Sequence, residues 1–435
     1  MPLPDPASPA DESPSPSAPR WGYRWKICLL LFFATTINYV DRAVIGILKP
    51  TLMADLEWDE EDFANVMAAF SFAYALGYGF GGRAMDLLGV RVGYALAVAA
   101  WSAAAMAHGL ARSVLGFGMM RAALGLAEGG NFPAAVKSVS QWFPKRERAL
   151  ATGLFNAGSN VGALVAPAIV PWITANFGWP VAFYATGALG FIWLIFWWMW
   201  YEAPERHPDV SPEELAYIQS DPIDPPQSIS WLELLRHRQV WAFIVGMSLS
   251  SPIWWFYLYW AAGFFYDRFD FDLKNIGWPL ITIYAIADFG SIGGGWLSGW
   301  LIKRGWSLNA ARKLALLACA LCVVPVFAAA MVQSGWIAVG LISLAAAAHQ
   351  GFSANLYTLV SDMAPRKVVS SIVGLGGMSA GFVAMGFQIF TGYVLENWEN
   401  GYLAILAVAS VSYLINLLII HLLVPRLEPM VIKGE

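Results

Sequence analysis

Apolar segments of about twenty residues recur twelve times along this chain, and this repetition limits its fold more than any other feature. A helix needs ~20 apolar residues to cross the hydrocarbon core of a bilayer. Only helices and closed barrels satisfy every backbone hydrogen bond there. The pattern predicts an all-α polytopic membrane protein with twelve transmembrane helices, at about 25–48, 62–83, 91–110, 113–136, 149–172, 179–201, 240–264, 276–302, 312–333, 335–359, 368–394 and 400–424.

The scarcity of charge argues against a soluble protein. Charged residues make up 13% of the chain and hydrophobic residues 58%, whereas soluble domains carry about 25% charged residues. We therefore expect the lipid bilayer as surroundings and no nucleic acid partner.

The spans fall into two groups of six. A Pro-rich and Ser-rich segment, 1–20, is typical of a disordered tail, and a polar loop, 202–239, separates a bundle at 21–201 from one at 240–425, which a tail at 426–435 follows. The halves share a pattern: Ser140, Pro144 and Gly153 recur 221 positions later as Ser361, Pro365 and Gly374. The sequence thus predicts two pseudo-symmetric six-helix bundles with alternating access between them.

Lysine and arginine predict the orientation. If both termini are cytoplasmic, nineteen basic residues lie on that side, against four on the other: Lys49, Arg112, Arg268 and Lys274. Cytoplasmic loops carry the excess of Lys and Arg, so we expect cytoplasmic termini and a cytoplasmic loop at 202–239.

Charged residues stand deep inside several predicted spans: Asp41 and Arg42 in the first, Arg121 and Glu128 in the fourth, and Asp288 in the eighth. A charge at mid-bilayer costs ~2.5–3.5 kcal/mol on insertion scales, and such residues usually face a bundle interior or a cavity. The guanidinium fork of Arg42 suits a carboxylate ligand. Asp41 and Glu128 are candidates for binding and releasing protons.

Helical spacing groups these charges. Arg121 and Glu128 are seven residues apart and share a helix face, so Arg121 is either a second anion ligand or the partner of Glu128. Asp41 is offset by about 100° from Arg42 and is expected to reach a neighbouring helix. The alternative is that these residues form salt bridges that only fix the packing. Lys137 is expected to snorkel, and Asp288 to be a helix-contact or gating residue.

Polar and aromatic residues on other predicted helices fit a hydroxyl-rich ligand, which needs several donors and acceptors and an aromatic platform. Packing is an alternative for each aromatic residue. His349 occupies the position in the second half that Glu128 occupies in the first. The candidate ligand-binding residues are Tyr74, Asn160, Trp255, Tyr259, His349 and Gln350.

The chain carries none of the signatures that would indicate an enzyme: a zinc-like cluster, GxSxG or a phosphate loop. We expect no catalytic residues, no metal site and no cofactor other than a proton as coupling ion. A receptor that signals without transport is a second alternative, but the central loop is short for an output domain.

One motif resembles the signature loop of the major facilitator superfamily, G-x-x-x-D-x-x-G-x-R. It is "GGRAMDLLGVR", residues 81–91. The resemblance implies gate roles for Gly82, Asp86, Gly89 and Arg91. Leu87 stands where the family usually has an arginine, which leaves out one charge of that gate.

Further segments resemble the anion:cation symporter family, and within it the bacterial hexuronate transporters. These are "INYVDR", "AEGGNFPAA", "ADFGSIGGGWLSGWLIKRGW" and "HQGFSANLYTLVSDMAPRK". The resemblance implies proton-coupled uptake of a sugar acid such as galacturonate or glucuronate across a bacterial inner membrane, by rocker-switch alternating access. It leaves open an aldonate, an aldarate or an aromatic acid. We expect a monomer.

Related galactonate carriers suggest roles for single residues. By this resemblance Asp41 and Glu128 match the protonatable pair, and Arg42 matches the arginine near the substrate carboxylate. Arg121 matches the arginine coupled to the acidic pair, Tyr74 a substrate-facing tyrosine, and Asn160 falls where a polar contact is expected.

Overall fold

A computed structural model describes residues 22–220 and 230–430, and this part of the chain is built from helices. The first bundle contains α1 (Tyr23–Ile47), α2 (Lys49–Leu56), α3 (Glu60–Leu88), α4 (Val90–Ala107), α5 (Val114–Glu128), α6 (Asn131–Trp142), α7 (Lys145–Phe177) and α8 (Trp179–Trp200). The second contains α11 (Arg238–Phe269), α12 (Gly277–Lys303), α13 (Leu308–Val323), α14 (Gly335–Met363), α15 (Arg366–Asn397) and α16 (Gly401–Leu423). Shorter helices complete the described structure: α9 (Pro212–Ile218), α10 (Trp231–Leu234) and the 3-10 helices His108–Leu110, Pro204–Arg206 and Val324–Ala330.

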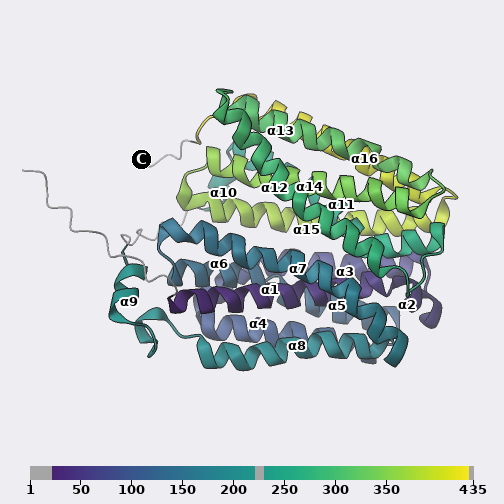
Figure 1. The fold of residues 1–435 in the computed structure, drawn as a ribbon, viewed down its shortest axis with the longest axis horizontal. Helices are drawn as coiled ribbons and strands as arrows, with labels where there is room; N and C mark the ends of the chain where they lie inside the picture. The colour runs from purple at the N-terminus through teal and green to yellow at the C-terminus, as the bar shows by residue number, and fades with distance from the viewer. Residues whose placement is uncertain (1–21, 221–229, 431–435) are drawn as a thin grey trace, which may run out of the picture.

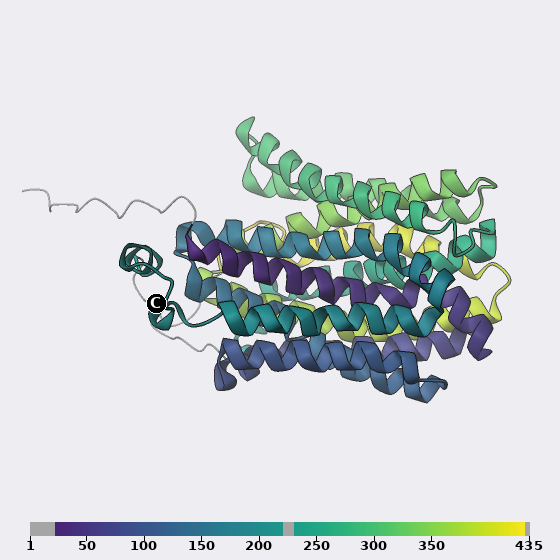
Figure 2. The same cartoon turned by 60° about the horizontal axis from the view of Figure 1, so that its bottom comes forward.

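The helices form two bundles that lie against each other, as predicted. Figure 1 shows the N-terminal bundle, purple to teal, below the C-terminal bundle, green to yellow. The described chain begins and ends at the same end of the molecule, here called the termini end, and α2 lies at the opposite end, the α2 end. The turned view of Figure 2 shows the same layering of long, roughly parallel helices.

Eleven helices of the described chain are long and apolar enough to cross a membrane. The prediction of one continuous fourth span at 113–136 is wrong. That region is split into α5 and α6, which meet at Gly129 and Gly130. The break has a local cause, because Pro133 has no N–H to continue the helical ladder and two successive glycines weaken the preceding turn.

Local sequence signals explain where several helices begin. The Asp59 carboxylate accepts a hydrogen bond from the Asp62 N–H at 2.7 Å and caps α3. Gly89 separates α3 from α4 with a φ of +74°. This conformation favours glycine, since a Cβ would strain it. The tight α3–α4 connection of the signature loop therefore depends on Gly89.

Glycines allow the helices of each bundle to approach closely. A Cβ on Gly125 of α5 would lie 2.5 Å from the Phe70 carbonyl oxygen of α3, and one on Gly294 of α12 would lie 2.4 Å from the Gly351 Cα of α14. Small residues at such crossings are typical of membrane helices, which associate by close packing. The Gly125 contact fixes the height and rotation of α5 against α3.

The segment between the bundles is folded in part. It contains α9 and α10, so the predicted loop at 202–239 is not without structure. The Glu214 carboxylate of α9 accepts hydrogen bonds from the backbone N–H groups of Tyr23 and Arg24, at 2.9 and 3.1 Å. These bonds dock α9 on the start of α1. The tail predicted at 1–20, and positions 431–435 of the C-terminal tail, lie outside the described residues.

Hydrogen bonds join the two bundles at the α2 end. The Glu60 N–H of α3 donates to the Glu396 carboxylate of α15 at 3.2 Å, and the Asn397 side chain donates to Glu61 at the same distance. A Cβ on Gly46 of α1 would lie 2.5 Å from the Leu258 carbonyl oxygen of α11. The bundles are therefore in backbone contact here.

Lys49 is part of this junction at the α2 end, opposite the termini, and it is buried at the start of α2 rather than exposed in a connection. It begins α2 and is 1% exposed. Its Nζ lies 2.8 Å from Glu60 Oε1 and 4.9 Å from the ring centre of Trp260 in the other bundle. The connection folds into a helix here because Pro50 is suited to a first helical turn.

Candidate functional site

Arg42 and Glu128 form a buried ion pair inside the N-terminal bundle. The Arg42 Nη2 and Nε atoms lie 2.9 and 3.0 Å from Glu128 Oε2. Their side chains are 3% and 0% exposed. Both N–H groups converge on one carboxylate oxygen, and Glu128 Oε1 has no hydrogen-bond partner among the described residues. The pair is therefore held tightly on one side and unsatisfied on the other.

The helical period of α1 positions the groups around this pair. Asn38 lies one turn before Arg42, and its Oδ1 accepts a hydrogen bond from Arg42 Nη2 at 3.3 Å. Asp41 projects from a different face, where Thr186 of α8 and Arg121 of α5 are its neighbours. Asp41 is 2% exposed, and neither carboxylate oxygen has a hydrogen-bond partner within the described chain.

Arg121 does not pair with Glu128, which was one of its two predicted roles. Its Nη2 donates to the backbone carbonyl of Arg42 at 3.2 Å. Its Nε and Nη1 atoms are buried and have no partner in the part that the structure describes. Both arginines thus lie at one depth, with Glu128 bound to the first and donor capacity left on the second.

Aromatic side chains from both bundles enclose the arginines. The Arg42 guanidinium carbon lies 4.6 Å from the ring centre of Tyr74 and 5.3 Å from that of Phe70. Trp255 of α11 packs edge-on against Tyr74 at 5.5 Å, and Tyr259 lies 5.8 Å from the Arg121 guanidinium. The candidates Tyr74, Trp255 and Tyr259 therefore gather at the charged cluster, where α3 meets α11.

Sequence reasoning missed two members of this wall, Phe70 and Tyr39. The Tyr39 ring centre lies 4.8 Å from the Arg42 guanidinium. Their spacing was the available signal, because Phe70 precedes Tyr74 by four residues and Tyr39 precedes Arg42 by three, so each pair shares a helix face.

His349 belongs to a different group of side chains inside the C-terminal bundle. Its Nδ1 lies 2.6 Å from the Tyr413 hydroxyl of α16, and its ring stacks on Trp254 at 5.2 Å. Gln350 is the next residue on α14 and is partly exposed. The structure places these two candidates on the second bundle, with contacts of their own.

Asn160 lies on α7 of the first bundle. It is partly exposed, and its Oδ1 accepts a hydrogen bond from the Ser159 hydroxyl at 3.3 Å. Asp288 on α12 is also partly exposed. The Lys137 ammonium donates to the Met85 carbonyl at 2.9 Å, which ties α6 to the end of α3.

The predicted gate residues lie at the α3–α4 connection. Arg91 forms an ion pair with Glu202 and donates to the Trp198 carbonyl at 3.2 Å. Gly82 has open space around it, since a Cβ there would meet no described atom within 4 Å. The side chain of Asp86 lies outside the part that the structure describes. Arg91 therefore joins α4 to the end of α8 within one bundle.

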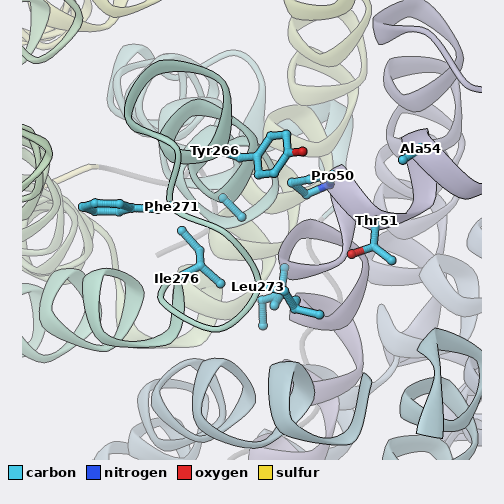
Figure 3. A pocket seen from close by; sticks show the side chains of 9 residues that line it. Pro50, Thr51, Ala54, Tyr266, Phe271, Leu273 and Ile276 are labelled. Atoms are coloured by element: carbon cyan, nitrogen blue, oxygen red, sulfur yellow. The ribbon is translucent and has the colours of Figure 1, made fainter. Parts of the chain in front are cut away.

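A cavity of about 150 Å³ lies between the bundles at the α2 end (Figure 3). Pro50 and Thr51 of α2 line one side, and Tyr266 of α11 with Phe271 and Leu273 of the next loop line the other. Its walls are mostly apolar and contain none of the candidate residues. The contact between the bundles at this end is therefore tight around Lys49 and looser beside it.

Two packed helical bundles with buried charges at their centre define a polytopic transporter, and the chain belongs to the Major Facilitator Superfamily, whose family model matches residues 31–388. It is a multi-pass membrane transporter and not an enzyme.

Among its relatives is the hexuronate transporter of Escherichia coli (strain K12), 32% identical over 92% of this chain and 93% of that protein. The galacturonate transporter of Dickeya chrysanthemi is 31% identical over 75% of this chain and 96% of its own length. The fold is similar to the xylose transporter XylE from E. coli, with a TM-score of 0.69 at 13% identity over 93% of this chain and 98% of the other. The two relatives by sequence are thus named as transporters of a hexuronate and of galacturonate.

Proposed function

We propose that this protein is a proton-coupled symporter that takes up a sugar acid, with an aldohexuronate such as galacturonate or glucuronate as substrate. The observation that carries the proposal is the buried Arg42–Glu128 ion pair with the unpaired Asp41 carboxylate beside it. One site thus contains a guanidinium suited to a carboxylate ligand and two carboxyl groups that protons can neutralise.

The geometry suggests how proton and anion are coupled. Glu128 holds the two Arg42 N–H groups that a substrate carboxylate would need. When Glu128 takes up a proton, its attraction to Arg42 weakens and the fork becomes available to the anion. Because the site is buried and of low dielectric, binding the anion without neutralising Glu128 would leave uncompensated negative charge. Proton and substrate therefore bind together.

The aromatic wall fits a hydroxylated ring. Tyr74 and Trp255 offer a face and a polar edge, which suit a sugar ring beside the arginine. The names of the relatives favour a hexuronate over other acids. We therefore place the substrate carboxylate at Arg42 and the ring against Tyr74 and Trp255. Asn160 on α7 and His349 and Gln350 on α14 are proposed as further contacts, for which His349 would have to give up its contact with Tyr413.

Transport would proceed by a rocking of the two bundles around this site. The hydrogen bonds between α3 and α15 at the α2 end would break as that side opens, and the Gly82–Arg91 loop would take part in closing the other side. A ligand shifts such an equilibrium only through its different affinity for the two states. The excess of Lys and Arg supports cytoplasmic termini in a bacterial inner membrane.

The test is uptake of labelled galacturonate into proteoliposomes under an imposed inward pH gradient. Controls omit the gradient or add excess unlabelled glucuronate, galactonate, galactarate or benzoate. Accumulation that depends on the gradient and is blocked by glucuronate supports a hexuronate–proton symporter. Uptake of another acid under the same gradient replaces the substrate and keeps the mechanism. If folded protein moves no acid at all, the proposed function is wrong and a receptor role returns.

A further inference from the structure

His108 is a fully buried histidine that the sequence reasoning did not single out. It begins the 3-10 helix at the α2 end of α4 and is 0% exposed. Its ring stacks on Phe183 of α8 at 5.2 Å and meets Phe117 of α5 at 5.6 Å. The histidine therefore sits between three helices of the N-terminal bundle, away from the junction with the other bundle.

The hydrogen bonding of His108 leaves one nitrogen free to accept a proton. Nδ1 lies 2.7 Å from the Ala104 carbonyl oxygen, which can only accept, so Nδ1 carries the hydrogen and Nε2 the lone pair. Nε2 is buried and has no hydrogen-bond partner among the described residues. A purely structural helix-end histidine would be expected to use both nitrogens or expose one.

The two rings that contact His108 lie about one helical turn from residues that neighbour Asp41. Phe117 stands four residues before Arg121 on α5, and Phe183 stands three residues before Thr186 on α8. At 1.5 Å per residue, the two helices descend about 6 and about 4.5 Å from the level of His108 toward that of Asp41. Arg121 lies within electrostatic reach of both His108 and Asp41, and Thr186 neighbours Asp41. We call these four residues, His108, Thr186, Arg121 and Asp41, the N-bundle seam.

Every member of the N-bundle seam carries a buried polar atom that makes no close hydrogen bond within the described chain, although the Thr186 hydroxyl stands next to the Asp41 carboxylate. These atoms are His108 Nε2, Thr186 Oγ1, Arg121 Nε and Nη1, and both carboxylate oxygens of Asp41. An unsatisfied buried polar group costs roughly 1–3 kcal/mol. Water bridges such groups where several of them converge. The seam therefore has the donor and acceptor content of a hydrated path.

The outer end of the seam is polar as well. Arg112 donates to the carbonyl of Gly109, next to His108, at 2.8 Å and lies over the ring of Trp179 at 4.8 Å. The Trp179 indole donates to Asp55, an exposed residue of α2, at 2.7 Å. His108 thus lies one layer below charged groups at the α2 end.

We propose that the N-bundle seam conducts protons between the aqueous phase at the α2 end and Asp41, on a route separate from the substrate path between the bundles. This inference rests on the proposed proton-coupled transport. A proton from water binds His108 Nε2 to give an imidazolium, and the same Nε2 then releases it through bridging water to an Asp41 carboxylate oxygen. The Arg121 charge opposes a lasting imidazolium at His108, so the proton is passed on rather than held there.

The test separates proton movement from substrate movement. Proteoliposomes holding pyranine report proton entry during galacturonate uptake, and counterflow at equal pH reports substrate exchange without net proton flux. The variants are His108→Phe, which keeps an aromatic ring against Phe183, and Thr186→Val, which keeps the volume and removes the hydroxyl. His421→Phe and Thr282→Val are matched controls, on the exposed surface of α16 and on α12.

In both seam variants we expect gradient-driven accumulation and proton entry to fall at least fivefold, while counterflow stays within twofold of wild type. The dependence of uptake on pH at the α2 side should flatten in His108→Phe, and His108→Gln should not restore it, because glutamine cannot carry the proton. Melting temperatures show that each variant is folded.

Three outcomes would overturn the proposal. If wild type is coupled and both seam variants remain equally coupled, the proton takes another route and the seam alone is rejected. If counterflow falls together with proton entry in His108→Phe while Thr186→Val is normal, His108 is a packing residue. If the wild-type protein performs counterflow yet moves no proton, the proposed proton coupling is wrong, and so is the proton route through the seam.

Discussion

The Arg42 guanidinium on α1 and the Glu128 carboxylate on α5 lie 2.9 Å apart in a fully buried setting, although 86 positions separate them in the chain. A buried ion pair contributes little net stability, because desolvation of both charges offsets their attraction. Its presence at the centre of a transporter bundle is better explained by exchange of partners than by stability. Each partner becomes available when the other is neutralised or occupied.

Replacing Arg42 should remove acid binding. In Arg42→Ala the charge-assisted hydrogen bonds to the substrate carboxylate are lost, and truncation of such a buried contact costs on the order of 2–5 kcal/mol. We expect at least a thirtyfold loss of galacturonate affinity by calorimetry on purified protein. Arg42→Lys should recover only part of this affinity, because the ammonium keeps the positive charge but lacks the planar pair of N–H donors. Normal concentration of substrate by the alanine variant would show that Arg42 does not hold the anion.

Replacing Glu128 should change the pH dependence of binding. In wild type, substrate affinity should weaken as pH rises, because ionised Glu128 then occupies Arg42. Glu128→Gln mimics the neutral form, so its affinity should be flat with pH and equal to the low-pH affinity of wild type. Titrations with galacturonate over a pH series measure this. Parallel slopes in the two proteins would contradict the competition between Glu128 and substrate.

Asp41→Asn should uncouple transport while sparing exchange. The amide cannot take up a proton. The change should disturb packing little, because neither Asp41 carboxylate oxygen makes a close hydrogen bond to the described residues. Gradient-driven accumulation in proteoliposomes should fall at least tenfold, with counterflow at equal pH within about threefold of wild type. Accumulation that persists in Asp41→Asn would assign the coupling to Glu128 alone.

The Lys49–Glu60 pair should stabilise the contact between the bundles at the α2 end. Lys49→Ala leaves a mostly buried carboxylate unpaired, and we expect it to cost about 2 kcal/mol, below the 3–5 kcal/mol of a fully buried pair, since the Glu60 side chain is 15% exposed. The double variant Lys49→Ala/Glu60→Gln should lose less than the sum of the single changes. Denaturation in detergent of the wild type, the two single variants and the double variant gives a double-mutant cycle. Strictly additive free energies would mean that Lys49 and Glu60 are not coupled.

Gly46 should control whether the α2 end can close. In Gly46→Val the added side chain would overlap the Leu258 carbonyl and the Tyr259 Cα of α11, so the bundles should separate there. A cysteine placed at Ala262, which lines the cavity at this end, should then react faster with an impermeant maleimide. Gly340→Val on α14 is the control, because a Cβ there meets no described atom within 4 Å. Equal reactivity in both variants would argue against a closed α2 end.

The candidate site shows what sequence patterns can and cannot predict. The seven-residue spacing of Arg121 and Glu128 placed them on one face of α5, and the offset of Asp41 from Arg42 placed those two on different faces of α1. Neither spacing could decide which arginine pairs with Glu128, because that depends on the height of α5 against its neighbours. The Gly125 contact with α3 sets that height. His108 escaped notice because its partners come from α5 and α8, at a distance in sequence.

The sequence by itself predicted an all-helical membrane protein, the two-bundle organisation and the chemical types of residue available at the site. These follow from hydropathy, length and glycine or proline position, which are local properties that add along a chain. Only the tertiary structure decided which charges meet and that Lys49 and His108 are buried. Such contacts require separate helices to match in depth and rotation to within about an ångström. Packing between helices sets this depth and rotation, and no single segment encodes that packing.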